Sequence, residues 1–226
     1  DAAENIPETK RKNNTIYTKG IFKKIEPLKL QWLTSLPNPD RTQIFFTPIV
    51  GWNEYNKGMV GLALYNNTPL ERTFEYQLSP LWSFAQQDLA GYAHVGFNFF
   101  PNIMFQRISV GIRAQRFDYS NEPFEMDYNK ISPELFVEFK KKRAISPFTH
   151  TLKYRNIIVI QEDYTTTKAE DGYPLYFHHT SNFNYNVLDY KFNYKHVITP
   201  ISIALNVQQS NDFVKTCITA NYSYNF

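Results

Sequence analysis

The chain has 226 residues, a formal net charge of +3 and a mean hydropathy of −0.46. This small and scattered charge excludes the strongly basic class of nucleic-acid-binding proteins, so no nucleic acid is expected as a partner. No apolar run approaches the roughly 20 residues that a membrane helix needs, which excludes helical membrane spans.

The first 40 residues predict a periplasmic linker followed by a lead-in strand. Residues 1–27 are polar and basic and show no periodicity. Leu28, Leu30 and Trp32 alternate with polar residues and predict a short strand, and the Pro and Asn content of Leu36–Asp40 predicts a turn. The chain starts with neither Met nor an apolar signal region, so we expect a removed signal or an excised piece of a longer protein.

Residues 41–226 predict an outer-membrane β-barrel. Successive side chains of a strand point to opposite faces, and residues 107–115 alternate between apolar and polar side chains almost without a break. Several such segments reach the 9–11 residues that a tilted strand needs to cross a bilayer. The fold class expected is therefore all-β, an antiparallel transmembrane meander of about ten strands, with closure as a complete barrel or as part of a larger one left open. The strands are predicted at 42–51, 58–66, 72–84, 88–100, 104–117, 128–141, 147–160, 175–195, 200–209 and 213–226.

The alternation assigns side chains to the two faces of these strands. Outer-membrane lipid is the expected partner of the apolar face, and a polar lumen is expected on the other. Aromatic residues make up 17% of the chain, and its 16 Tyr suit a membrane–water interface. The predicted lipid-facing residues are Phe74, Tyr76, Leu78, Ile108, Val110, Ile112, Leu135 and Val137. The predicted lumen-facing charged residues are Glu75, Arg107, Arg113, Glu134, Glu138, Lys153 and Arg155.

The connections and the strand interiors give further expectations. Long connections at Asp118–Asp127 and Gln161–Pro174 should lie outside the cell, and short turns at 101–102 and 141–146 should share the periplasmic side with the linker. Segment 175–195 changes parity, which predicts a bulge near 186–189. Pro48, Pro80 and Pro133 fall inside predicted strands, where we expect bulges or misplaced strand ends. The last six residues alternate and end on Phe226, which resembles the C-terminal signature of outer-membrane barrels.

The sequence offers no recognisable catalytic or metal-binding motif, so no cofactor is expected in this chain. His178 and His179 are adjacent, and in a strand they would point to opposite faces and would not share a metal. The lone Cys217 is expected to be inert. The lumen-facing charges are expected to form a ladder of ion pairs, because charges removed from water must be paired. A path for a solute or ion is the alternative, and catalysis by Glu134 or Glu138 is the least favoured.

Three segments together resemble a known family. They are NNTIYTKGIFKK at 13–24, QIFFTPIVGWN at 43–53 and GLALYN at 61–66, and YNKISPELFVEFKKKRAISP at 128–147 adds a weaker likeness. They resemble the C-terminal region of large aminopeptidase-N-like metallopeptidases (gluzincins) of Gram-negative bacteria. In that family a zinc peptidase domain precedes a linker and a barrel. The resemblance implies that the zinc ligands and the glutamate base lie upstream, and that no position of this chain takes over their roles.

These observations predict the barrel domain of an aminopeptidase-like protein. Its partners would be outer-membrane lipid and an upstream periplasmic domain of the same polypeptide, which would carry the catalysis. Two alternatives remain open. One is a transport barrel or pore for a small solute, and the other is a soluble β-barrel or sandwich that binds an apolar ligand. A soluble binder would carry its apolar side chains inside, which is the reverse of the predicted faces.

Overall fold

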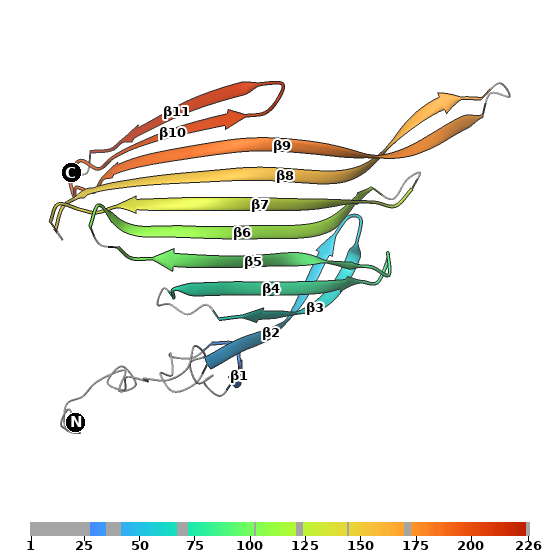
Figure 1. Ribbon diagram of the computed structural model, residues 1–226, viewed down its shortest axis with the longest axis horizontal. Helices are drawn as coiled ribbons and strands as arrows, with labels where there is room; N and C mark the ends of the chain where they lie inside the picture. Colours follow the sequence, from blue (N-terminus) through green and yellow to red (C-terminus); the bar gives the residue numbers. More distant parts are fainter. Residues whose placement is uncertain are drawn as a thin grey trace, which may run out of the picture.

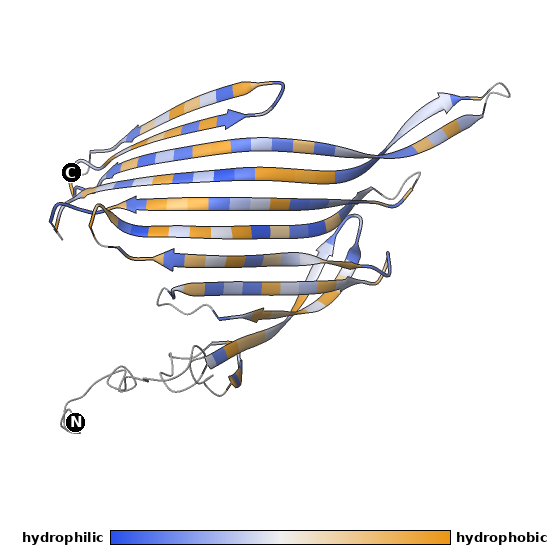
Figure 2. Ribbon diagram, in the orientation of Figure 1, coloured by the Kyte–Doolittle hydropathy of each residue, from blue (hydrophilic) through white to orange (hydrophobic). Residues whose placement is uncertain are grey.

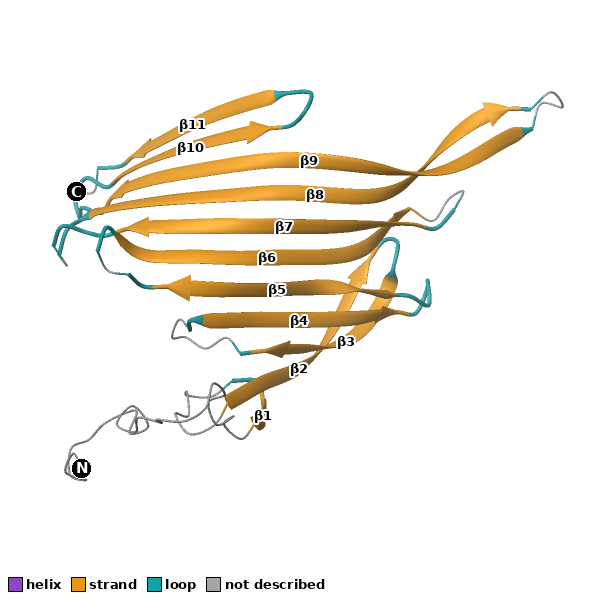
Figure 3. Cartoon of the chain, in the orientation of Figure 1, coloured by secondary structure: helices purple, strands orange, loops and turns teal. Residues whose placement is uncertain are grey.

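The computed structural model describes residues 28–34, 42–66, 72–101, 103–120, 124–143, 145–169 and 173–224. They form one eleven-stranded sheet in which the strands lie side by side in chain order, and no helix occurs among them (Figures 1 and 3). The predicted linker, the turn at 36–40 and Phe226 lie outside the described residues. The strands are β1 (Leu28–Trp32), β2 (Thr42–Asn53), β3 (Lys57–Tyr65), β4 (Phe74–Ser83), β5 (Leu89–Phe99), β6 (Phe105–Ser120), β7 (Met126–Phe139), β8 (Phe148–Lys168), β9 (Pro174–Tyr194), β10 (Ile201–Gln209) and β11 (Val214–Tyr222).

The predicted all-β antiparallel meander is confirmed, and the eleven strands correspond to the ten predicted strands and the lead-in strand. Bands of apolar and polar residues alternate along strands such as β6, as Figure 2 shows. Only β1 and β2 are parallel neighbours, with Leu28 beside Thr42. The sheet is open, because β1 and β11 occupy its two edges and no described strand joins them.

The connections between strands lie at two opposite ends of the sheet. We name these ends after the β8–β9 connection and the β7–β8 connection. The β8–β9 end holds the connections that follow β2, β4, β6, β8 and β10, and the β7–β8 end holds those that follow β3, β5, β7 and β9 (Figure 1). The residues flanking the two predicted long connections therefore share one end. Pro101 and the described part of 141–146 share the other, as an antiparallel meander requires.

The predicted long loop at 161–174 is wrong, because β8 continues to Lys168 and β9 begins at Pro174. Pairing persists along this extension, with Thr165 beside Phe177. β-Branched and aromatic residues in opposing pairs stabilise a ladder, which explains why this polar segment is a strand. The connection at 118–127 is also shorter than predicted, since Asp118 pairs with Asp127. The long strands, rather than long loops, carry the chain beyond the sheet at the β8–β9 end (Figure 1).

The bulge predicted near 186–189 is also wrong, because β8 and β9 keep one continuous register from Phe148–Tyr194 to Lys168–Pro174. The apolar side chains of β9 simply change faces. The change coincides with the end of β10, whose last partner on β9 is Asn186. Beyond that point β9 has β8 as its single described neighbour strand. The hairpin extension therefore continues the two faces of the sheet, but its apolar side chains lie on the opposite face.

No register shift occurs at the three strand prolines, so the bulges expected there are not found. The shifts in the β6–β7 ladder lie elsewhere, at Phe105/Arg107 and at Asp118/Ser120. Pro80 lies between Gly61 of β3 and Gly91 of β5. A Cβ atom on Gly61 would overlap the Pro80 carbonyl oxygen, and Gly91 has a φ of 142°. The two glycines let the neighbouring backbones approach where proline donates no ladder hydrogen bond.

Candidate functional site

Strand register sorts the side chains of the sheet into two faces, since directly opposed residues share a face. One row crosses five strands from Glu75 through Gly96 and Gly111 to Glu134 and Arg155. We call the face of this row the polar face, and the opposite one the apolar face. All seven charged residues predicted to face a lumen lie on the polar face: Glu75, Arg107, Arg113, Glu134, Glu138, Lys153 and Arg155.

The eight residues predicted to face lipid all lie on the apolar face. Phe74 is opposite Phe97, and Ile112 is opposite both Val95 and Pro133. Many of these side chains are exposed, Ile112 to 47% and Leu135 to 38%. The structure thus brings each predicted set together on its own face. The eight are Phe74, Tyr76, Leu78, Ile108, Val110, Ile112, Leu135 and Val137.

Glu134 is the centre of the ion-pair network on the polar face. Its Oε1 atom lies 3.0 Å from Arg113 Nη2 and accepts a hydrogen bond from Arg113 Nε at 3.1 Å. Its Oε2 atom lies 2.9 Å from Lys153 Nζ. His94 Nε2 is 3.6 Å from Oε1. The Glu134 carboxylate is therefore surrounded by side chains from β5, β6 and β8, which links four strands through one group.

A second polar group continues the network toward β10. Arg155 Nη2 donates to Asp189 Oδ2 at 3.0 Å, and Asn206 Nδ2 donates to Asp189 Oδ1 at 2.6 Å. Gln208 in turn donates to Asn206 Oδ1 at 2.9 Å. Sequence reasoning missed His94, Asp189 and Asn206. The alternation of 89–98 could have found His94, but the parity change in 175–195 obscured Asp189.

The other predicted charges lie outside these two groups. Arg107 stacks on the ring of Phe136, with its guanidinium carbon 4.7 Å from the ring centroid, and it is opposite Glu138 in the ladder. Glu75 accepts a hydrogen bond from the Arg72 backbone N–H at 3.1 Å. The polar face thus combines ion pairs with side-chain hydrogen bonds and a cation–π stack.

The apolar face is bordered by aromatic side chains at the β7–β8 end. Phe105 and Phe139 are opposed, with ring centroids 5.4 Å apart. Phe148 stacks on Tyr194 at 4.9 Å. His150 Nδ1 hydrogen-bonds the Tyr190 hydroxyl at 2.8 Å. A row of aromatic rings, in which Tyr and His add polar tips, is typical of a membrane–water boundary.

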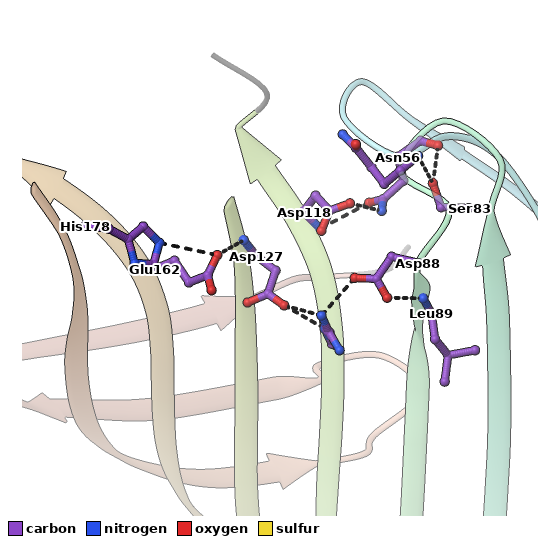
Figure 4. A network of polar contacts seen from close by, with 10 residues as sticks. Asn56, Ser83, Asp88, Leu89, Asp118, Asp127, Glu162 and His178 are labelled. Atoms are coloured by element: carbon purple, nitrogen blue, oxygen red, sulfur yellow. Dashed lines mark hydrogen bonds and ion pairs between the residues drawn. The ribbon is translucent and has the colours of Figure 1, made fainter. Parts of the chain in front are cut away.

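Polar contacts that involve Asp88, Asp127, Glu162 and His178 border the same face at the β8–β9 end (Figure 4). Arg116, which follows Ile112 and Ala114 on this face of β6, joins two of them. The Arg116 guanidinium bridges Asp88 at 2.8 Å and Asp127 at 2.6 Å. The Asp127 backbone N–H donates to Glu162 Oε2 at 3.3 Å, and His178 lies 3.8 Å from the same oxygen. The apolar face is therefore a belt with a polar boundary at this end.

The adjacent histidines do not form a shared site. His178 is beside Glu162, whereas His179 Nε2 lies 3.9 Å from Asp163 Oδ2, as the strand alternation predicted. Among the described residues, no three His, Cys, Asp or Glu side chains are grouped closely enough to hold a metal ion.

Comparison with protein families, curated proteins and solved structures finds no match to this chain. In the described parts of the chain, no helix is long and apolar enough to cross a membrane.

Proposed function

We propose that this chain is an outer-membrane β-barrel domain whose apolar face contacts lipid and whose polar face lines the interior. The observation that supports this proposal is the sorting of side chains by register. Every residue predicted to face lipid lies on the apolar face, and every charged residue predicted to face the lumen lies on the polar face. The polar face carries the charges, as the interior wall of a membrane barrel does.

The distribution of burial favours a membrane over a soluble sheet. Phe45, Met59 and Ala63 are buried, and strand register places them on the polar face, where the sheet is most enclosed. On the apolar face, large side chains such as Val110 and Trp82 stay exposed. A soluble sheet would bury that face, and a contiguous exposed apolar surface indicates contact with lipid or protein.

The dimensions of the belt fit a bilayer. On β6 the apolar face runs from Phe105 to Ala114 before Arg116 begins the polar border. This stretch matches the 9–11 residues that a tilted strand needs to cross the hydrocarbon core. The belt therefore has the length, the aromatic edge and the charged limit that a membrane-spanning strand requires.

We extend the proposal to an anchoring role, which rests on the sequence resemblance alone. In the family that the chain resembles, a zinc peptidase domain precedes the barrel. As an anchor, this domain would hold such a catalytic domain at the periplasmic side of the outer membrane. The reading frame upstream of Asp1 tests this role: an H-E-x-x-H zinc helix there supports it, and its absence from a frame long enough to encode a domain contradicts it.

A small-solute path is the second candidate function, and one hollow on the polar face favours it. Gly96 and Gly111 are opposed and leave a space of about 250 Å³ beside Glu75, His94 and Glu134. Ion conductance through reconstituted protein that is altered by Gly111→Leu would support a path. An anchor without a path would show no such conductance.

The three tryptophans offer a direct test of the lipid-facing proposal, because Trp32, Trp52 and Trp82 all lie on the apolar face. After reconstitution into vesicles that contain brominated lipid, we expect strong quenching of their fluorescence and weak quenching by aqueous acrylamide. The control carries Phe136→Trp on the polar face with the three native tryptophans replaced by Phe. Its fluorescence should resist brominated lipid. Equal lipid quenching of both proteins, or of neither, would contradict the proposal.

A further inference from the structure

A second hollow on the polar face lies between β5 and β8, beside the Glu134 network. Its volume is about 140 Å³, which is room for about four or five water molecules. Arg113 is opposite Ser132, Gln115 is opposite Lys130, and Arg155 approaches from β8. The lining consists of Tyr92, Arg113, Ala114, Gln115, Lys130, Ser132, Arg155 and Ile157.

The charge of this hollow is not balanced by its own wall. Three cationic side chains line it, and no carboxylate does. Arg113 and Arg155 bind Glu134 and Asp189, and neither acid lines the hollow. Lys130 has no ion-pair or hydrogen-bond partner among the described residues. The buried Nε atom of Arg155 also has none.

We propose that this hollow binds a small oxyanion, a phosphate or carboxylate group, on the interior wall. The Lys130 ammonium is the free charged donor, and charge-assisted hydrogen bonds to an oxyanion are among the strongest available to such a group. Arg113 and Arg155 add two positive charges to the same wall. The buried Ser132 hydroxyl adds a neutral donor. An anion seated there would accept a hydrogen bond from Lys130 and would offset the three cationic side chains of the wall.

The proposal deepens the function proposed above. It rests on that function only for the position of the hollow inside a barrel, because binding of the anion requires just the folded sheet. Binding by the folded sheet and contact with lipid are therefore separate measurements. If phosphate fails to bind, the tryptophan quenching can still support contact with lipid. If the quenching fails, phosphate binding can still be measured.

The test is calorimetric titration of the full chain, folded in neutral detergent micelles, with inorganic phosphate at constant ionic strength. We expect saturable binding at one site. Lys130→Gln should weaken it on the order of tenfold, since a hydrogen bond to a charged group is removed. The matched control is Lys191→Gln, which also removes a polar-face lysine but lies outside the hollow. This control should bind phosphate as the unmodified chain does.

The titrations would overturn the proposal if the unmodified chain showed no saturable binding, if the two substitutions weakened binding equally, or if Lys130→Gln did not weaken it. Far-UV circular dichroism of each variant checks that the sheet is intact. A chain with Ser132→Ala supplies a second, milder change if Lys130→Gln disturbs folding, and it should also weaken binding. Anionic phospholipid added to the micelles should not displace phosphate. Displacement would place the hollow at a lipid surface and contradict an interior site.

Discussion

Ile112 and Arg113 are neighbours in β6 that meet different surroundings. Ile112 lies among Val95 and Pro133 on the apolar face, while Arg113 reaches Glu134 on the polar face. The cost of a charge at either position therefore depends on which face contacts lipid. This pair of residues tests the assignment of the faces more sharply than any residue alone.

Ile112→Arg should lower the free energy of unfolding in lipid by about 2–4 kcal/mol, because a charge near the bilayer midplane is costly. The control is Arg113→Ile, which removes an ion pair whose Arg side chain is half exposed and should cost about 0–1 kcal/mol. Denaturant unfolding in phospholipid vesicles measures both. An Ile112→Arg effect no larger than that of Arg113→Ile would argue against a lipid-facing Ile112.

At the residue scale, the alternation of odd and even positions along each strand is enough to assign the predicted side chains to their faces. It could not predict which charges meet, because that depends on the register between strands. Glu134 contacts Lys153 and Arg113 because β6 and β8 flank β7, an arrangement no single strand encodes. Asp189 was missed because the apolar parity of β9 changes beside it.

At the scale of elements, the proline of β4 shows how the sheet tolerates a missing ladder donor. Pro80 is flanked by Gly61 and Gly91, and neither position has room for a Cβ atom without movement of the β4 backbone. The three residues act as one packing unit across β3, β4 and β5. A bulge is not needed, because close approach of the backbones replaces it.

Gly61→Ala should therefore destabilise the sheet by about 1–3 kcal/mol, since the added methyl group forces the β4 backbone to shift. Gly58→Ala in the same strand is the matched control, because no atom lies within 4 Å of the position of its Cβ. Thermal unfolding of both variants in the same detergent measures the difference. Equal stability of the two variants would show that Pro80 and Gly61 are not closely packed in solution.

The strands were predictable as elements, but the length of the β8–β9 hairpin was not. Alternation located every strand, and turns that contain Pro or Asn marked several strand ends, since these are local signals. Thr165 to Lys168 have the composition of a loop. They form a strand because Phe177, Tyr176 and their neighbours pair with them. Pairing between segments overrides local composition, so the extension appears only in the structure.

The whole molecule is a curved wall with one apolar belt and two different ends. The β7–β8 end carries the aromatic row. The β8–β9 end carries the charged border (Figure 4) and the long hairpin (Figure 1). This asymmetry suits a barrel whose strands project on the outer side of the membrane and end near the surface on the other. If the proposed function holds, this asymmetry predicts a single orientation of the chain in the outer membrane.

That orientation predicts which basic residues a protease reaches. Lys168 ends β8 at the β8–β9 end, and Lys141, Lys142 and Arg143 follow β7 at the opposite end. With the chain exported to the outer membrane of a Gram-negative host, trypsin added to intact cells should cut at Lys168 and spare 141–143. Permeabilised cells are the control, in which both sites become accessible. Cleavage at 141–143 with Lys168 protected would invert the orientation, and cleavage at both in intact cells would mean that no membrane separates the two ends.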